Sequence, residues 1–379
     1  MVKKQKTAGI MTFHRSHNCG SILQSYATQQ TLRNFGLKPE FIDFSNAGQT
    51  NLYAIYREVH SARDAIVNMT KVPMQKKLKD DFRSYDRYIK KHLALSKKSY
   101  TRGSELDEDE LGYDYYLTGS DQVWNITIAD GDDAYFLPFV KKHPKIAYAV
   151  SQGAKDIAEY ADDKQKYKDM ISDIDYLSVR EKNGQKWLKD AFNIKSERVL
   201  DPTLLLDAKD YSEIEEDAGM AGKDYIFVYA APLSKEFERY VRQVAKEHSL
   251  KIVLWHSNVW FKFFGWLKGY ILPKKQNPGK YLDLMKNARM VFTGSFHGAI
   301  FAAQYRKDFW VFKNPGMKKS GDDRMITLLE NFSLDDRFLH ADKPPADVMR
   351  PVSYKKFEAQ LVKDRKKSLD FLRAALKKK

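Results

Sequence analysis

The sequence contains a single cysteine, Cys19, among its 379 residues. One thiol excludes an intrachain disulfide, and it also excludes a metal centre built from several thiolates of the same chain. A reducing compartment is consistent with this cysteine count. We interpret Cys19 as a small buried residue at a turn rather than as a nucleophile.

Long apolar runs and common ligand-binding motifs are also missing from the sequence. No stretch approaches the roughly 20 apolar residues that span a membrane. The short apolar run after the basic N-terminus predicts a first strand rather than a signal peptide, so we expect a cytoplasmic protein. Neither G-x-x-x-x-G-K-[ST] nor G-x-G-x-x-G occurs, which argues against nucleotide binding through those loops. No metal-ligand spacing such as H-E-x-x-H occurs, so we predict no metal site.

Positive charge, by contrast, is abundant: 65 Lys and Arg residues against 50 Asp and Glu residues give a net charge of +15. This excess favours anionic partners such as phosphorylated metabolites, acidic lipid surfaces or nucleic acid, although a lysine-rich surface alone would also explain it. The length exceeds what one hydrophobic core usually serves, so we expect two domains. With 43% hydrophobic residues, the chain can fill two cores.

Short apolar runs alternate with longer helical patterns along the chain. The predicted strands are 7–13, 40–44, 113–118, 146–150, 176–179, 225–230, 251–256, 290–293 and 308–312, and the predicted helices include 21–35, 182–192, 234–248 and 322–332. This alternation predicts an α/β fold with two Rossmann-like domains, each built on a parallel sheet. We place the first domain at 1–200 and the second at 201–350, because Pro202 suits a joint between them. A charged helical segment at about 52–92 is interpreted as an insertion in the first domain.

Residues 351–379 form a basic segment whose apolar residues recur at helical spacing. These residues are Phe357, Leu361, Leu369, Leu372 and Leu376. We expect a helix that packs this apolar stripe on the protein, back across the first domain. A helix lying on a membrane surface, favoured by the three lysines at 377–379, is the other interpretation.

Small hydrogen-bonding or charged residues follow most of the predicted strands directly. The candidates for ligand contact are Asn18, Ser120, Asp121, Gln122, Asn125, Ser151, Arg180, His256, Ser295 and His297. Because parallel sheets bind ligands outside the carboxyl ends of their strands, we expect these side chains to line one cleft between the domains. Purely structural roles are the alternative, since Ser120 and Asp121 would equally well cap a helix. Asn18 opens a helix whose N-terminus favours an anion.

Two arginines are candidate ligands for an anion. Arg180 directly follows a predicted strand, and Arg324 begins a predicted helix. A guanidinium at this end of a sheet can bind a carboxylate or a phosphate through two parallel hydrogen bonds. The alternative for Arg180 is a structural ion pair with an acidic neighbour.

Five stretches, taken in order, carry a family resemblance. They are GIMTFHRSHNCGSILQSYA, YLTGSDQVWN, YLSVREKNG, VLDPTLLLD and VFTGSFHGAIFA. Each alone is unspecific, but the ordered set resembles the polysaccharide pyruvyl transferase family, and the resemblance extends over roughly residues 9–332.

The resemblance implies a two-domain fold similar to that of the GT-B glycosyltransferases, with the active site between the domains. It implies transfer of pyruvate from phosphoenolpyruvate to two hydroxyls of a sugar, which forms a cyclic ketal, and it implies no further cofactor. The acceptor would belong to a bacterial exopolysaccharide, a capsule or a cell-wall glycan precursor, often one still linked to a lipid. Nucleic acid is not an expected partner.

The resemblance also singles out one residue. Many members carry Arg-x-His-Gly where this chain has Ser-Phe-His-Gly at 295–298, and relatives with Ser-Phe-His-Gly usually have an aspartate where Gly294 stands. We expect His297 to be a general acid/base or a direct contact to the donor, because histidine exchanges protons near neutral pH. The arginine that holds the anionic donor must then come from elsewhere, and Arg180 and Arg324 are the candidates.

Residues 256–275 mix aromatic side chains with lysines. Such a surface suits stacking on sugar rings or contact with a membrane interface, and a partly buried loop or an oligomer contact is the plain alternative. We hypothesise an acceptor-side or bilayer-facing loop, and with it peripheral association with the cytoplasmic face of a membrane. Two other functions fit the sequence: a GT-B-type glycosyltransferase that uses a nucleotide sugar, and a non-catalytic binder of polysaccharide or nucleic acid.

Overall fold

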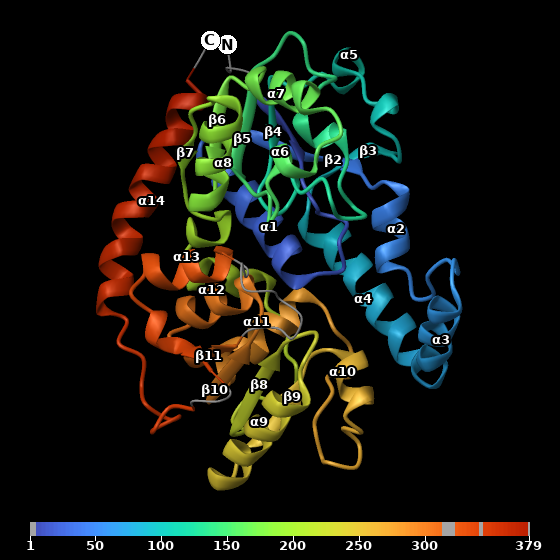
Figure 1. Ribbon diagram of the computed structural model, residues 1–379, viewed down its shortest axis with the longest axis vertical. Helices are drawn as coiled ribbons and strands as arrows, with labels where there is room; N and C mark the ends of the chain where they lie inside the picture. Colours follow the sequence, from blue (N-terminus) through green and yellow to red (C-terminus); the bar gives the residue numbers. More distant parts are fainter. Residues whose placement is uncertain (1–4, 313–322, 341–343, 378–379) are drawn as a thin grey trace. The chain divides into compact units, whose positions relative to one another are not determined.

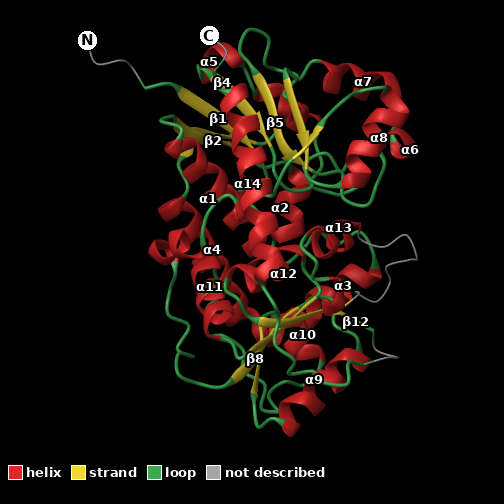
Figure 2. Cartoon of the chain, turned by 90° about the vertical axis from the view of Figure 1, so that its left-hand side faces the viewer, coloured by secondary structure: helices red, strands yellow, loops and turns green. Residues whose placement is uncertain are grey.

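The computed structural model describes residues 5–312, 323–340 and 344–377. The chain divides into two compact units. Unit 1 draws its residues from the ranges 1–68, 89–206 and 362–379, whereas unit 2 draws them from 69–88 and 207–361. Each unit contains one sheet flanked by helices (Figures 1 and 2).

The sheet of unit 1 has seven parallel strands in the order β3-β2-β1-β4-β5-β6-β7. They are β1 (Thr7–Met11), β2 (Lys38–Phe44), β3 (Leu95–Tyr100), β4 (Tyr115–Thr118), β5 (Lys145–Val150), β6 (Tyr176–Val179) and β7 (Glu197–Arg198). The chain runs outward from β1 to β3 and then begins β4 on the other side of β1, so the topological switch point lies between β1 and β4. Both faces of a parallel sheet are covered, which explains why every residue of β4 and β5 is buried.

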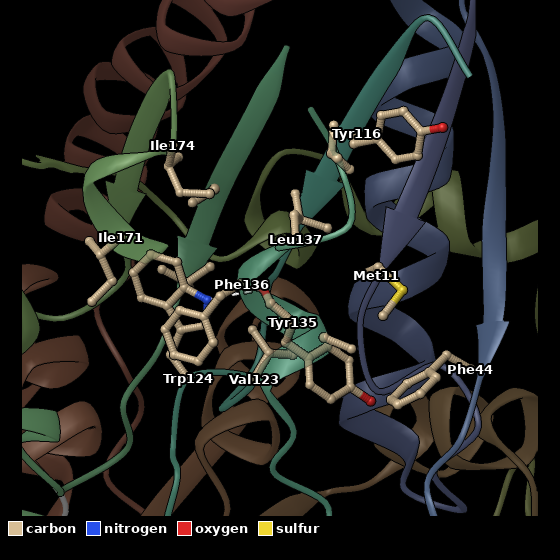
Figure 3. Close-up of a cluster of buried hydrophobic side chains, with 14 of the residues drawn as sticks. Met11, Phe44, Tyr116, Val123, Trp124, Tyr135, Phe136, Leu137, Ile171 and Ile174 are labelled. Carbon is tan, nitrogen blue, oxygen red and sulfur yellow. Dashed lines mark hydrogen bonds between the residues drawn. The ribbon is translucent and has the colours of Figure 1, made fainter. Parts of the chain in front are cut away.

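Helices cover both faces of this sheet. The helices of unit 1 are α1 (Cys19–Asn34), α2 (Ala47–Tyr53), α5 (Glu108–Leu111), α6 (Ile157–Tyr160), α7 (Lys164–Ser172), α8 (Lys182–Phe192) and the part of α14 (Lys355–Ala375) that begins at residue 362. Helix α3 (Ala62–Lys71) has no buried residue, and its last three residues group with unit 2. One face carries the cluster drawn in Figure 3, in which Trp124 and Phe136 stack with 4.9 Å between their ring centroids. On the other face, Tyr148 of β5 packs against Phe371 of α14, and the Tyr115 hydroxyl donates a 2.9 Å hydrogen bond to the carbonyl of Leu376.

The sheet of unit 2 has five parallel strands in the order β12-β11-β10-β8-β9. They are β8 (Tyr225–Tyr229), β9 (Lys251–Leu254), β10 (Met290–Thr293), β11 (Asp308–Phe312) and β12 (Phe338–Leu339). The helices are α9 (Lys235–Glu247), α10 (Ser257–Lys262), α11 (Pro278–Asn287), α12 (Phe296–Gln304) and α13 (Asp323–Asn331), and α4 (Gln75–His92) contributes residues to both units. The chain moves from β8 to β9 and then to β10 on the other side of β8, so this switch point lies between β8 and β10.

Two parallel α/β units confirm the predicted fold class. Every predicted strand lies in one of the sheets, and β3, β7 and β12 were not predicted. Residues 69–88 group with unit 2, although the sequence had suggested an insertion in the first domain. Residues 362–379 group with unit 1, where the Ser368 hydroxyl accepts a 2.9 Å hydrogen bond from the amide of Leu200.

No helix among the described residues combines the length and apolarity needed to cross a bilayer. The same part of the chain holds no group of three or more His, Cys, Asp or Glu side chains arranged to bind a metal ion.

Candidate active site

Polar side chains gather at the carboxyl ends of the strands in both units. At each switch point a threonine hydroxyl links the two diverging strands. Thr12 Oγ1 donates to the carbonyl of Ser120 over 2.9 Å, and Thr293 Oγ1 donates to the carbonyl of Tyr229 over 2.8 Å. At each switch point, this hydrogen bond holds together the ends of the two strands before their loops separate.

The residues that follow β1 form an ion cluster. Arg15 makes a two-pronged ion pair with Asp43 of β2, and His14 Nε2 lies 3.2 Å from Oδ1 of the same carboxylate. Burial raises the pKa of Asp43, but hydrogen bonds from His14, Arg15 and Ser99 outweigh burial and hold this pKa well below its usual range. His14 and Arg15 are thus committed to holding β1 against β2.

The loop after β4 is packed into the interior of unit 1. Ser120 is fully buried, and its hydroxyl donates to the carbonyl of Ala149 over 2.9 Å. Asp121 has a φ of 73°, a left-handed conformation that is uncommon outside glycine, and its Oδ2 accepts a 2.6 Å hydrogen bond from the Ser21 hydroxyl. These contacts hold the loop against α1 and β5. The Ser120 hydroxyl therefore has a structural role.

Four further sequence candidates lie at the same edge and also bond locally. Gln122 Oε1 accepts from the side-chain amide of Asn125 over 3.1 Å. The Ser151 hydroxyl accepts from the amide of Gly153 over 3.0 Å, and Asn18 caps α1 by accepting an amide hydrogen bond in its first turn. Gln122 is half-buried and Asn18 is exposed, so these two can also reach a ligand.

Arg180 follows β6, as predicted, but its side chain is only 3% exposed. Its Nε donates to Glu181 over 2.7 Å and its Nη1 donates to Asp201 over 2.7 Å. Burial lowers the pKa of Arg180, but the carboxylates of Glu181, Asp201 and Asp121 raise it above the ordinary value. These contacts favour the structural ion pair over the donor-binding role expected from the sequence.

Asp130, Tyr53 and Tyr135 belong to the same region of unit 1, and the sequence analysis did not single them out. Asp130 is 5% exposed, and its burial, with the negative charge of Asp121, raises its pKa to about 6. The Tyr135 hydroxyl is buried and has no hydrogen-bond partner within the described ranges. Burial raises the pKa of Tyr53. No motif marks these residues; only their position near the loop after β4 could have suggested them.

At the other edge, the turn from β10 into α12 depends on small residues. The Ser295 hydroxyl caps α12 by accepting from the amide of Gly298 over 3.3 Å. The amide of Ser295 in turn donates to Thr293 Oγ1 over 3.0 Å. A Cβ on Gly298 would lie 2.1 Å from Thr293 Oγ1 and 3.2 Å from the ring of Tyr229, so only glycine fits without a shift. This packing fixes the first turn of α12.

Both predicted histidines border one aromatic cluster of unit 2. His297 lies in the first turn of α12, is 8% exposed, and has its carbonyl 3.5 Å from the Tyr281 hydroxyl. His256 follows β9, and burial lowers its pKa to about 4, so it is neutral at pH 7. Tyr229 stacks on His256 at 5.1 Å and lies 4.7 Å from Tyr281, both between ring centroids. Tyr229 and Tyr281 were missed, although Tyr229 lies near the end of the predicted strand 225–230 and is the last residue of β8. The Ser257 hydroxyl is also buried, with no partner in the described part of the chain.

Arg324 lies at the start of α13 and is half-buried. Helix α13 packs beside α12, which carries His297. Because its side chain reaches the surface of unit 2, Arg324 remains a candidate ligand for an anion.

The two edges differ in charge. In unit 1, the carboxylates of Asp121, Glu181 and Asp201 act on Arg180, and Asp130 interacts with Asp121. In unit 2, the segments 229–231, 255–258 and 293–298 at the ends of β8, β9 and β10 contain two histidines and no carboxylate. An anion therefore meets less repulsion at the edge of unit 2.

A family model described as "Polysaccharide pyruvyl transferase" matches residues 18–315. The chain belongs to this family. The range matched by the family model contains every residue that the sequence analysis proposed for the site except Arg324. No curated protein sequence matches the chain.

Solved structures resemble this member of the pyruvyl transferase family in fold. A Listeria monocytogenes protein assigned as a UDP-N-acetylglucosamine 2-epimerase has a TM-score of 0.52 at 11% identity, over 98% of this chain and 88% of that one. The S. aureus MnaA–UDP co-structure has a TM-score of 0.48 at 12% identity, covering 98% and 91% of the two chains. E. coli heptosyltransferase WaaC has a TM-score of 0.40 at 9% identity, covering 86% and 99%. The Listeria structure supports the same class of two-unit α/β fold, and such low identity carries nothing about the reaction.

Proposed function

We propose that this protein transfers the pyruvyl group of phosphoenolpyruvate to two hydroxyls of a sugar, forming a ketal on a bacterial exopolysaccharide, capsule or cell-wall glycan precursor. The observation that carries the proposal is His297, held in the first turn of α12 inside the range matched by the family model. This is the histidine of the motif through which the sequence resembles the family.

The reaction needs three changes at the donor. The methylene carbon gains a proton, the neighbouring carbon forms bonds to two sugar oxygens, and its bond to the phosphate oxygen breaks. The two hydroxyl protons end on the new methyl group and on the released phosphate, so no oxidant or reductant is needed. A histidine can deliver and accept protons in such a sequence, which is the role we assign to His297.

The charges favour the edge of unit 2 as the donor-binding site. Phosphoenolpyruvate carries a carboxylate and a phosphate, so we assign it to the edge of unit 2, at the N-terminus of α12 and near Arg324. The neutral His256 and the Ser257 hydroxyl offer hydrogen bonds there without repelling an anion.

The test combines binding with turnover. Calorimetry should show saturable binding of phosphoenolpyruvate, and incubation with acceptor glycans should release phosphate and add one pyruvyl ketal by mass spectrometry. His297→Ala should abolish turnover while its circular dichroism stays that of the wild type. His248→Ala, which removes an exposed histidine of the same unit, is the matched control and should retain activity. Full turnover by the His297→Ala protein removes this residue from the mechanism. Binding of a nucleotide sugar without binding of phosphoenolpyruvate replaces the proposal with a glycosyltransferase.

A further inference from the structure

Unit 2 exposes a cluster of large apolar side chains in the turns that follow α10. Phe264, Trp266 and Leu267 are 56%, 46% and 76% exposed. The ring centroid of Trp266 lies 5.3 Å from that of Phe264 and 5.4 Å from that of Phe261. We call Phe261, Phe264, Trp266 and Leu267 the aromatic surface. A contiguous exposed cluster of this kind marks an interaction site more often than scattered apolar residues do.

The support beneath the aromatic surface is well packed. Phe263 is buried in the core of unit 2, and Trp260 Nε1 donates a 2.8 Å hydrogen bond to the carbonyl of Tyr270. Gly265 lies directly on Trp260, since a Cβ there would be 2.3 Å from the indole ring. The chain then rejoins the sheet, where Ile271 exchanges backbone hydrogen bonds with the edge strand β9. The outward side chains are therefore held in place by a structured loop.

The charged residues of the segment that carries the aromatic surface are of one sign. Residues 256–275 contain four lysines and no Asp or Glu. Lys268 forms a 2.7 Å ion pair with Glu238. Lys262, Lys274 and Lys275 are exposed, and Lys262 Nζ lies 5.3 Å from the ring centroid of Phe263. Tryptophan and phenylalanine with flanking lysines match the interface of an anionic bilayer, where rings sit at headgroup level and ammonium groups meet phosphates.

We propose that the aromatic surface docks on a lipid bilayer that contains anionic headgroups. Phe264, Trp266 and Leu267 enter the headgroup region, and Lys262, Lys274 and Lys275 contact lipid phosphates. The proposal stands independently of the reaction, because it uses no residue of the candidate active site.

A second exposed apolar surface provides the matched control. Ile66 and Met69 of α3 are 61% and 70% exposed, so they offer similar apolar area. Their neighbours include Glu58 and Asp64, so this segment lacks the uniform positive charge. Replacing Ile66 and Met69 by serine removes apolar area without touching the aromatic surface.

The experiment is sedimentation of the full chain with vesicles of phosphatidylcholine alone or mixed with phosphatidylglycerol. The wild type should bind the mixed vesicles and release from them in high salt. Phe264→Asn/Trp266→Ser/Leu267→Ser should weaken binding by at least about tenfold. Asparagine is chosen at position 264 because φ there is 52°. Lys262→Gln/Lys274→Gln/Lys275→Gln should weaken binding by roughly fivefold for each lysine.

A spectroscopic variant keeps the proposal testable if the triple replacement fails to fold. Trp266→Phe should still sediment, but it should lose a vesicle-induced blue shift of tryptophan emission that the wild type shows. The proposal is wrong if the wild type does not bind anionic vesicles, or if Ile66→Ser/Met69→Ser abolishes binding instead. It is also wrong if Trp266→Phe retains the full vesicle-induced blue shift of tryptophan emission. Lipid-free self-association that only the triple replacement removes would assign the aromatic surface to a second copy of the chain.

Discussion

Asp130 offers a direct test of the electrostatics of unit 1. Its carboxyl is 5% exposed, and burial raises its pKa from 3.8 to about 6. Between these two values the folded protein binds more protons than the unfolded chain, so stability falls as the pH rises through this window. A pKa shift of about two units corresponds to roughly 3 kcal/mol in the free energy of unfolding. This contribution to stability is present at low pH and is lost above pH 6. Asp130→Asn, which removes the charge at nearly constant shape, should therefore be up to about 3 kcal/mol more stable than the wild type at pH 7.

The assay is urea unfolding of both proteins at several pH values, followed by tryptophan fluorescence. The difference in the free energy of unfolding should be largest at pH 7 and should shrink towards pH 4, because the wild-type carboxyl is then protonated. Other titrating groups act on both proteins and cancel in the difference. Asp162→Asn, at an exposed position of unit 1, is the control and should show no such trend. A difference that does not vary with pH, or a less stable variant at pH 7, would refute the reasoning.

Two further replacements test the edges of the sheets. Arg180→Met should destabilise the protein by about 3–5 kcal/mol in urea unfolding, because it leaves Glu181 and Asp201 buried without their partner. Unchanged stability together with lost binding of phosphoenolpyruvate would instead support a donor-binding role for Arg180. Gly298→Ala should destabilise by about 1–3 kcal/mol and reduce turnover, since its Cβ collides with Thr293. If the space beside Gly298 were open, alanine would instead stabilise α12 by about 1 kcal/mol. The sign of the change in the free energy of unfolding therefore shows whether the contact with Thr293 excludes a Cβ.

The sequence predicted the layered α/β architecture because nine strands are short apolar runs separated by amphipathic helices. It missed β3, whose residues LSKKSY are mostly polar, since an edge strand needs little apolar burial. It also missed β7 and β12, which have two residues each and produce no period.

The sequence located candidate side chains but not their contacts. His256 and His297 follow predicted strands, and the structure brings both to the carboxyl edge of the sheet of unit 2, because topology alone places them there. The sequence left the role of Arg180 open between donor binding and an ion pair, because Asp201, its partner, lies 21 residues away and only the fold brings the two together. Neighbouring residues show the same limit: Phe263 is 5% exposed and Phe264 is 56% exposed, although their sequence context is nearly identical.

The threonine hydroxyls at the two switch points have a consequence for engineering. Thr12 and Thr293 each join neighbouring strand ends through a side chain rather than through the main-chain ladder. Valine at either position would remove this bond and also the hydrogen bond that the hydroxyl accepts, from the side-chain amide of Gln24 at Thr12 and from the amide of Ser295 at Thr293. Each substitution would therefore change the turn that follows the strand while the main-chain ladders of the two sheets remain intact.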